Sequence, residues 1–199
     1  DPMGRTKLAH TLMYLTRGQP VLYYGDEQGL VGDGADKGAR ESLFATQTAE
    51  YQNYKLLDGT PAGSQDRFGE TEMSTHIAAL ANLRSEHKAL GTGSQTTLHY
   101  DDGQGVFAFA RVDRQEKVEY LVAINNSDSA KEATFATLTP GATYSPLYGT
   151  QDSVTATDTV SLTVPALSAV VFKANTQVAD AGQSQTIAVS TGAPENGLT

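Results

Sequence analysis

QTTLHYDDGQGVFAFARV, residues 95–112, carries the clearest structural signal in this sequence. Its two halves repeat with a period of two, which is the pattern of β-strands that bury one face. Asp101-Asp102-Gly103 separates the halves and supplies residues that are typical of a tight turn. The stretch therefore predicts a β-hairpin with strands over residues 95–100 and 105–112.

The residues that follow the hairpin continue this pattern. Glu119–Asn125 is an almost entirely apolar strand core, and Pro140-Gly141 marks a turn between two later runs. The remaining runs that are typical of strands cover residues 131–137, 142–148, 160–164 and 167–173. Short strands separated by regular turns predict an antiparallel β-sandwich.

Residues 1–91 differ in composition and show helical patterns around one short strand. Val21-Leu22-Tyr23-Tyr24 is a continuous apolar and aromatic run, typical of a buried strand in a parallel sheet. Gly18 and Pro20 precede it and end the first helix. The expected helical segments cover residues 4–17, 39–57 and 74–87, with Ser74 or Thr75 as the cap of the last.

The composition excludes several classes of protein. The chain has 199 residues, a formal net charge of −9 and no cysteine, so it can form neither disulfides nor thiolate metal sites. Phosphate backbones would repel so acidic a chain, and we therefore expect no nucleic-acid partner. No run reaches the roughly 18 apolar residues of a membrane span, so we expect no membrane partner. The sequence opens inside a helical pattern, which favours a fragment of a longer protein.

GQPVLYYGDEQ, residues 18–28, resembles the eighth β-strand of the catalytic barrel in the α-amylase family, glycoside hydrolase family 13. Three later features resemble that family in the same order. They are the loop after the strand (GARESLF, 38–44), the last barrel helix (IAALANLRSEHKAL, 77–90), and the strands of the following sandwich (106–111, 125–126 and 167–172).

The resemblance implies an α+β chain in two main parts. Residues 1–91 would be the terminal (β/α) segment of a TIM barrel, and residues 92–174 the C-terminal antiparallel β-sandwich. Residues 175–199 are turn-rich and polar. We interpret them as a linker or the start of a further β module, with residues 186–189 as a candidate strand.

The resemblance also implies a function for the longer parent protein. It would be a bacterial, secreted or periplasmic, retaining glycosidase that acts on α-glucans or maltooligosaccharides. The family works through three carboxylates, the last of them in an Asn-His-Asp motif that is absent here. A retaining glycosidase needs a pair of carboxyl groups about 5–5.5 Å apart. We therefore expect no catalytic residue in this chain and no activity from the fragment alone.

A non-catalytic carbohydrate-binding or structural β-sandwich module is the alternative. Its mark would be an exposed aromatic platform on the sandwich. The tyrosines that could supply one are Tyr100, Tyr120, Tyr144 and Tyr148, although tyrosines on alternating strands are more often part of the core.

Three residues are candidates for contact with the substrate. Tyr24 offers a ring face to a sugar or points into the barrel core. Glu27 follows the expected barrel strand, at the end where such barrels keep their active sites, and either binds substrate or makes a structural hydrogen bond. Arg40 either binds sugar or ties down the glycine-rich loop of residues 25–38 through an ion pair.

We expect no cofactor or metal in this chain, because its four histidines have no ligand spacing. The resemblance leaves calcium binding open for the parent protein. A single barrel strand cannot satisfy its own backbone groups. We therefore expect residues 1–90 either to be partly disordered or to pair with another chain, in which case the fragment would self-associate through the exposed barrel strand.

Overall fold

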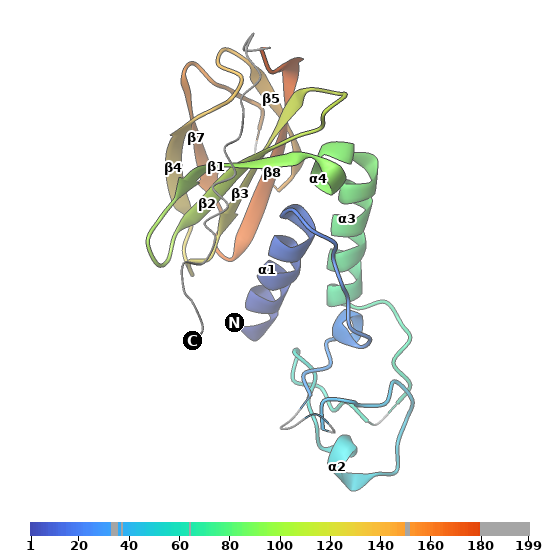
Figure 1. Ribbon diagram of the computed structural model, residues 1–199. Helices are drawn as coiled ribbons and strands as arrows, with labels where there is room; N and C mark the ends of the chain where they lie inside the picture. The colour runs from blue at the N-terminus through green and yellow to red at the C-terminus, as the bar shows by residue number, and fades with distance from the viewer. Residues whose placement is uncertain (33–35, 37, 64, 150–151, 180–199) are drawn as a thin grey trace, which may run out of the picture.

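The structure, a computed structural model, describes residues 1–32, 36, 38–63, 65–149 and 152–179. A two-sheet β-sandwich forms one end of the molecule, and the helices lie beside it and extend toward the other end (Figure 1). The helices are α1 (Pro2–Leu15), η1 (Asp26–Gln28), α2 (Ala49–Gln52), α3 (Glu72–Glu86) and α4 (Lys88–Thr92). The strands are β1 (Ser94–Tyr100), β2 (Val106–Val112), β3 (Val118–Asn125), β4 (Lys131–Ala136), β5 (Thr143–Tyr148), β6 (Val154–Thr155), β7 (Thr159–Val164) and β8 (Ser168–Gln177).

The strands form the antiparallel sandwich that the sequence predicts. One sheet has the order β1-β2-β3-β8-β5-β6, and the other contains β4 and β7. Every strand pair is antiparallel. The strand that the sequence analysis missed is β6, because two residues are too short to show a period.

The central strands of the six-stranded sheet, β2, β3 and β8, are buried on both faces. On β3, Leu121 and Ala123 belong to the core between the two sheets, whereas Tyr120 and Val122 belong to a second core against the helices. A strand that is buried on both faces has apolar residues at nearly every position. This double burial explains why β3 reads as a continuous apolar run, while β4 and β7 alternate.

Two polar residues of β3 are also fully buried and join neighbouring segments. The Tyr144 hydroxyl donates to Oε2 of Glu119 at 2.7 Å, and the Leu138 amide donates to Oε1 at 3.0 Å. Burial, reinforced by the hydrogen bond to Glu119, raises the pKa of Tyr144. At the other end of β3, the Asn125 amide nitrogen donates to the Val164 carbonyl at 3.0 Å. Both contacts connect β3 with segments outside its own hairpin.

Arg84 of α3 binds the C-terminal ends of two helices. Its Nη1 donates to the carbonyls of Tyr14 on α1 and Leu90 on α4, at 2.6 and 2.8 Å. The last carbonyls of a helix have no partner within that helix. The guanidinium supplies donors there and complements the negative ends of both helix dipoles.

Arg111 of β2 continues this arrangement inside the core. It is fully buried and donates to the carbonyls of Leu15, Ser94 and Gly93 at 2.7, 3.1 and 3.2 Å. Burial lowers its pKa to about 10. The two arginines thus hold the end of α1 against the junction of α4 and β1.

Helix α3 begins three residues before the expected start. Thr71 is its N-cap: the Ser74 amide donates to the Thr71 hydroxyl at 2.9 Å, and the Thr71 amide donates to the Ser74 hydroxyl at 2.8 Å. The expected cap residue Ser74 therefore belongs to this reciprocal capping box at its third helical position. The helix buries Met73, Ile77, Leu80 and Leu83.

His76 of α3 contacts both α1 and β5. Its Nε2 lies 3.0 Å from the Lys7 carbonyl and 3.0 Å from the Thr11 hydroxyl, which itself donates to the Lys7 carbonyl. Since both of these acceptors face Nε2, this nitrogen carries the proton. Nδ1 lies 3.5 Å from the Tyr148 hydroxyl. Burial lowers the pKa of His76 and favours the neutral ring.

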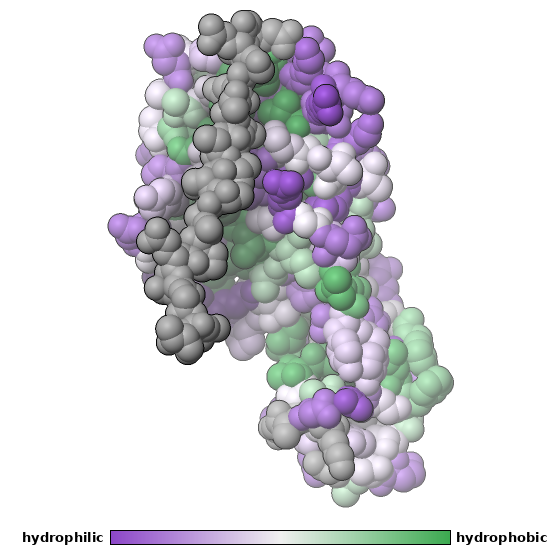
Figure 2. Space-filling view, viewed as in Figure 1, coloured by the Kyte–Doolittle hydropathy of each residue, from purple (hydrophilic) through white to green (hydrophobic). Residues whose placement is uncertain are grey.

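Two segments differ from the sequence-based expectation. Residues 21–24 form no strand, because a strand of a parallel sheet needs paired neighbours and none lies beside this segment among the described residues. The helix expected over residues 39–57 is limited to the four residues of α2. Hydrophobic residues reach the surface in residues 18–70, here called the N-terminal lobe, as Figure 2 shows.

The C-terminal end of the sandwich extends past the expected boundary. Strand β8 continues to Gln177, three residues into the interpreted linker. The candidate strand at residues 186–189 lies outside the described residues. No helix in the described ranges is long and apolar enough to cross a bilayer.

Replacement of Arg111 tests the arginine arrangement. We expect Arg111→Met to lower the free energy of unfolding by about 2–4 kcal/mol, because two buried carbonyls and one partly buried carbonyl lose their donors. Chemical denaturation followed by circular dichroism measures this loss. Arg5→Met is the control, since the ion pair of Arg5 with Asp128 is exposed and contributes about 0–1 kcal/mol. Equal losses in the two variants would contradict the structural role of Arg111.

The stability should also depend on pH through His76. An unfolded histidine takes up a proton below about pH 6.5, whereas burial disfavours the protonated form in the folded chain. The stabilisation is therefore complete above about pH 6.5 and is lost as the pH falls below it. We expect His76→Gln to weaken this dependence in denaturation curves between pH 5 and 8. His87, whose pKa burial also lowers, accounts for the remainder. Identical profiles for the two proteins would contradict this prediction.

Candidate functional site

A tight turn after residues 21–24 holds one of the three candidate residues. Gly25 and Gly29 flank η1 with φ angles of 93° and 74°, in the left-handed region that favours glycine. A Cβ atom on Gly25 would lie 2.5 Å from the Leu30 side chain. Glycine is therefore required at Gly25 for both its backbone angle and the available space.

Glu27 makes a local structural hydrogen bond. Its Oε2 accepts from the Gly25 amide at 2.9 Å, and its carbonyl accepts from the Thr71 hydroxyl. The neighbouring Asp26 has its Oδ2 3.5 Å from Nε2 of His10 on α1. The two adjacent carboxylates thus have different partners and do not form a pair.

Tyr24 lies at the surface beside Tyr23. The side chain of Tyr24 is 45% exposed, and the two ring centroids are 4.8 Å apart. Desolvation, followed by the influence of Tyr23, raises the pKa of Tyr24, while the charge of Arg40 partly offsets the rise. The tyrosine pair is thus partly open to solvent, with Tyr23 54% exposed.

Arg40 forms an exposed ion pair within its own loop. Its Nη2 donates to both carboxylate oxygens of Asp36, at 2.8 and 3.0 Å. The sequence analysis missed its neighbour Glu41, which is buried and accepts from the Gly32 amide at 2.8 Å. An acidic residue directly after a glycine-rich loop was the available signal. Arg40 and Glu41 both tie this loop down.

The sandwich does not present the four tyrosines as one platform. Tyr120 and Tyr144 are buried in the two cores, and Tyr100 is 68% exposed on β1. These tyrosines thus do not form the exposed aromatic platform that is expected of a binding module on the sandwich. Within the described ranges, no group of three or more metal-ligating side chains could hold an ion.

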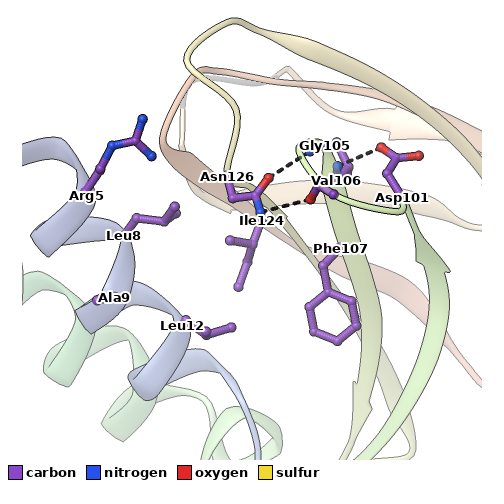
Figure 3. A pocket seen from close by; sticks show the side chains of 11 residues that line it. Arg5, Leu8, Ala9, Leu12, Asp101, Gly105, Val106, Phe107, Ile124 and Asn126 are labelled. Carbon is purple, nitrogen blue, oxygen red and sulfur yellow. Dashed lines mark hydrogen bonds between the residues drawn. The ribbon is translucent and has the colours of Figure 1, made fainter. Parts of the chain in front are cut away.

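A groove of about 320 Å³ lies between α1 and the β2–β3 end of the sheet (Figure 3). Leu8, Leu12 and Phe107 give it an apolar lining. Polar groups at its rim are paired within the chain: Asp101 accepts from the Val106 amide, and Asn126 accepts from the Gly105 amide. A sugar needs unpaired hydrogen-bonding groups, so this groove suits apolar packing instead.

Comparison with known proteins places these features in a family. Residues 98–175 match the family model described as the α-amylase C-terminal all-beta domain. The chain is 42% identical over 205 aligned residues to an α-amylase of Streptomyces lividans. A cyclomaltodextrinase of Geobacillus thermopakistaniensis is 29% identical over 128 residues, which cover 64% of this chain and 18% of that protein.

Solved structures share the fold. An Anoxybacillus α-amylase matches 87% of this chain with a TM-score of 0.66 at 21% identity, over 33% of its own length. A Geobacillus thermoleovorans α-amylase, solved with acarbose, matches 88% of this chain with a TM-score of 0.64 at 21% identity, over 34% of its own length.

The aligned region covers 99% of this chain but 22% of the Streptomyces protein. The chain thus spans about a fifth of the length of the curated relatives that it matches. The fold, the matched domain and the related sequences agree with one another. The chain belongs to the α-amylase family and corresponds to its C-terminal portion, including the C-terminal all-beta domain.

Proposed function

We propose that this chain is the C-terminal part of a retaining, α-amylase-type glycosidase that acts on α-glucans or maltooligosaccharides. The observation that carries the proposal is the 42% identity to the Streptomyces α-amylase, which extends over 99% of the chain. The domain match over residues 98–175 supports it independently of the helical part.

In this proposal, residues 1–91 complete a (β/α)8 barrel that other segments of the polypeptide begin. Helices α1 and α3 pack against each other, and the segment of residues 21–24 runs between them along the chain. Paired with neighbouring barrel strands, this segment would become the eighth strand. Tyr24, Glu27 and Arg40 would then belong to the rim of the active site. In that setting Glu27 and Arg40 would hold the rim in place, and Tyr24 would offer its open face to sugar.

The catalytic carboxylates would come from outside this chain. Retaining hydrolysis requires two carboxyl groups about 5–5.5 Å apart, one of them protonated. Asp26 and Glu27 are each engaged by a different partner, as described above. We propose a secreted or periplasmic bacterial enzyme, and we leave any calcium to the barrel segments of the parent protein.

A starch assay tests the proposed function. We expect a longer polypeptide that carries this sequence to release reducing sugar from soluble starch, and the 199-residue chain to release none. The product should first appear as the α-anomer, which proton NMR detects, because two displacements retain the configuration. Intact-mass analysis of both proteins provides the control for proteolysis. Starch left intact by the longer polypeptide, or a β-anomeric first product, would overturn the proposal.

We also propose that the isolated chain self-associates through residues 21–24. These residues are apolar or aromatic and exposed, with Val21 75% exposed. An exposed run of this kind, without strand partners in the described part of the chain, can pair with the same run of a second copy.

Sedimentation velocity tests the self-association. We expect the wild-type chain to form dimers or larger species as its concentration rises. Val21→Asp should shift the distribution to monomer, because a charge would be buried in the paired segment. Val31→Asp is the matched control: it changes another exposed valine outside the segment and should leave association unchanged. A wild-type chain that stays monomeric at all concentrations would overturn this proposal.

A further inference from the structure

Two phenylalanines form an exposed pair in the N-terminal lobe. Phe44 and Phe68 are 63% and 60% exposed, their ring centroids lie 4.9 Å apart, and their planes meet at 64°. Single exposed apolar residues are common on proteins, whereas two large exposed aromatic rings in contact indicate a surface that meets a ligand or partner.

The loops that carry the two rings are tied to each other. The Arg67 amide donates to the Leu43 carbonyl at 2.7 Å, and the Ala45 amide donates to Oδ1 of Asp66 at 2.9 Å. These contacts involve residues one or two positions from Phe44 and Phe68. The ring pair is therefore held in place before any ligand binds, which lowers the entropic cost of binding.

A shallow groove of about 660 Å³ begins at Phe68 and follows the exposed side of α3. Ala78 and Ala79 form its floor, and their small side chains leave room above the helix. Glu70 and Asn82 line it and are both exposed. The Thr75 hydroxyl donates to Oε1 of Glu70 at 3.1 Å, which orients the carboxylate.

The chemistry of this groove differs from that of the apolar groove beside α1. An aromatic ring at one end packs against the C–H face of a pyranose ring. A carboxylate accepts hydrogen bonds from the sugar hydroxyls, and an amide both donates to them and accepts from them. Ligand sites combine aromatic surface with a few polar groups in this way. The core of a protein interface would instead be depleted of charged groups such as Glu70.

We propose that Phe44, Phe68 and the groove along α3 bind a linear oligosaccharide of α-linked glucose. The choice of α-linked glucose rests on the proposed function, whereas the choice of a sugar rests on the groove itself. Phe68 supplies the stacking surface, Phe44 supports that ring edge-on, and Glu70 and Asn82 hold the hydroxyls.

Calorimetric titration of the 199-residue chain with maltoheptaose tests this proposal. We expect saturable binding, weakened at least tenfold by Phe68→Ala and several-fold by Glu70→Gln. Tyr100→Ala is the matched control, because Tyr100 is an equally exposed aromatic residue on the sandwich, and it should bind as the wild type does. Circular dichroism verifies that each variant is folded. Ala78→Arg fills the groove from an exposed helix position and should abolish binding without any change in the phenylalanine loops.

Two results would overturn the proposal: no binding by the wild type, or unchanged affinity in Phe68→Ala and Ala78→Arg. Equal affinity for cellohexaose would overturn only the assignment to α-linked glucose. If the longer polypeptide hydrolyses starch and both variants bind as the wild type does, the binding site in the groove is refuted and the proposed function stands. Binding that depends on Phe68, combined with an inactive longer polypeptide, would refute the proposed function alone.

Discussion

The need to supply donors to the carbonyls at the ends of helices governs how the two halves of this chain meet. Helix α1 and helix α4 both end at the six-stranded sheet, where water does not reach all of their last carbonyls. Arg84 and Arg111 provide the missing donors from two directions. Without them, the surrounding hydrophobic contacts would bury unpaired polar groups, which would make the packing of the helices on the sheet less stable.

The contrast between the two lobes follows from this arrangement. Near the sandwich, the apolar sides of α1 and α3 are covered by β2, β3 and β8. Farther away, several apolar and aromatic residues of the segment 18–70 are exposed, such as Val21, Tyr23 and Val31. Hydrogen bonds that Glu27, Glu41 and Asp66 accept from backbone amides hold these loops.

The sequence predicted the sandwich well because strand periods are local. The hairpin at residues 95–112 and the later strands, apart from the two-residue β6, were recognisable. The strand at residues 21–24 could not be judged in the same way, since its pairing partners are not determined by the segment itself. The apolar residues of 39–57 resembled a helix, but glycine-rich surroundings and cross-loop hydrogen bonds favour extended loops there.

The candidate site was harder to predict than the fold. Glu27 accepts a local hydrogen bond and Arg40 forms an ion pair within its loop, while contact of either residue with substrate stays a prediction. The roles of Glu41, Arg84 and Arg111 were not foreseen, because each of them depends on carbonyls or amides that are distant in sequence or on a particular loop geometry. Side-chain chemistry alone does not indicate which backbone groups a folded chain leaves unpaired.

The double burial of the six-stranded sheet has a consequence for protein engineering. A sandwich with one exposed face can be moved between hosts as a cassette, since only its ends need joining. Here the helix-facing side of β2, β3 and β8 is as apolar as the side facing β4 and β7. A graft cut at the α4–β1 junction would expose that face, together with the guanidinium of Arg111. The transplantable unit therefore includes α1, α3 and α4, and its boundary lies well before the point where the strands begin.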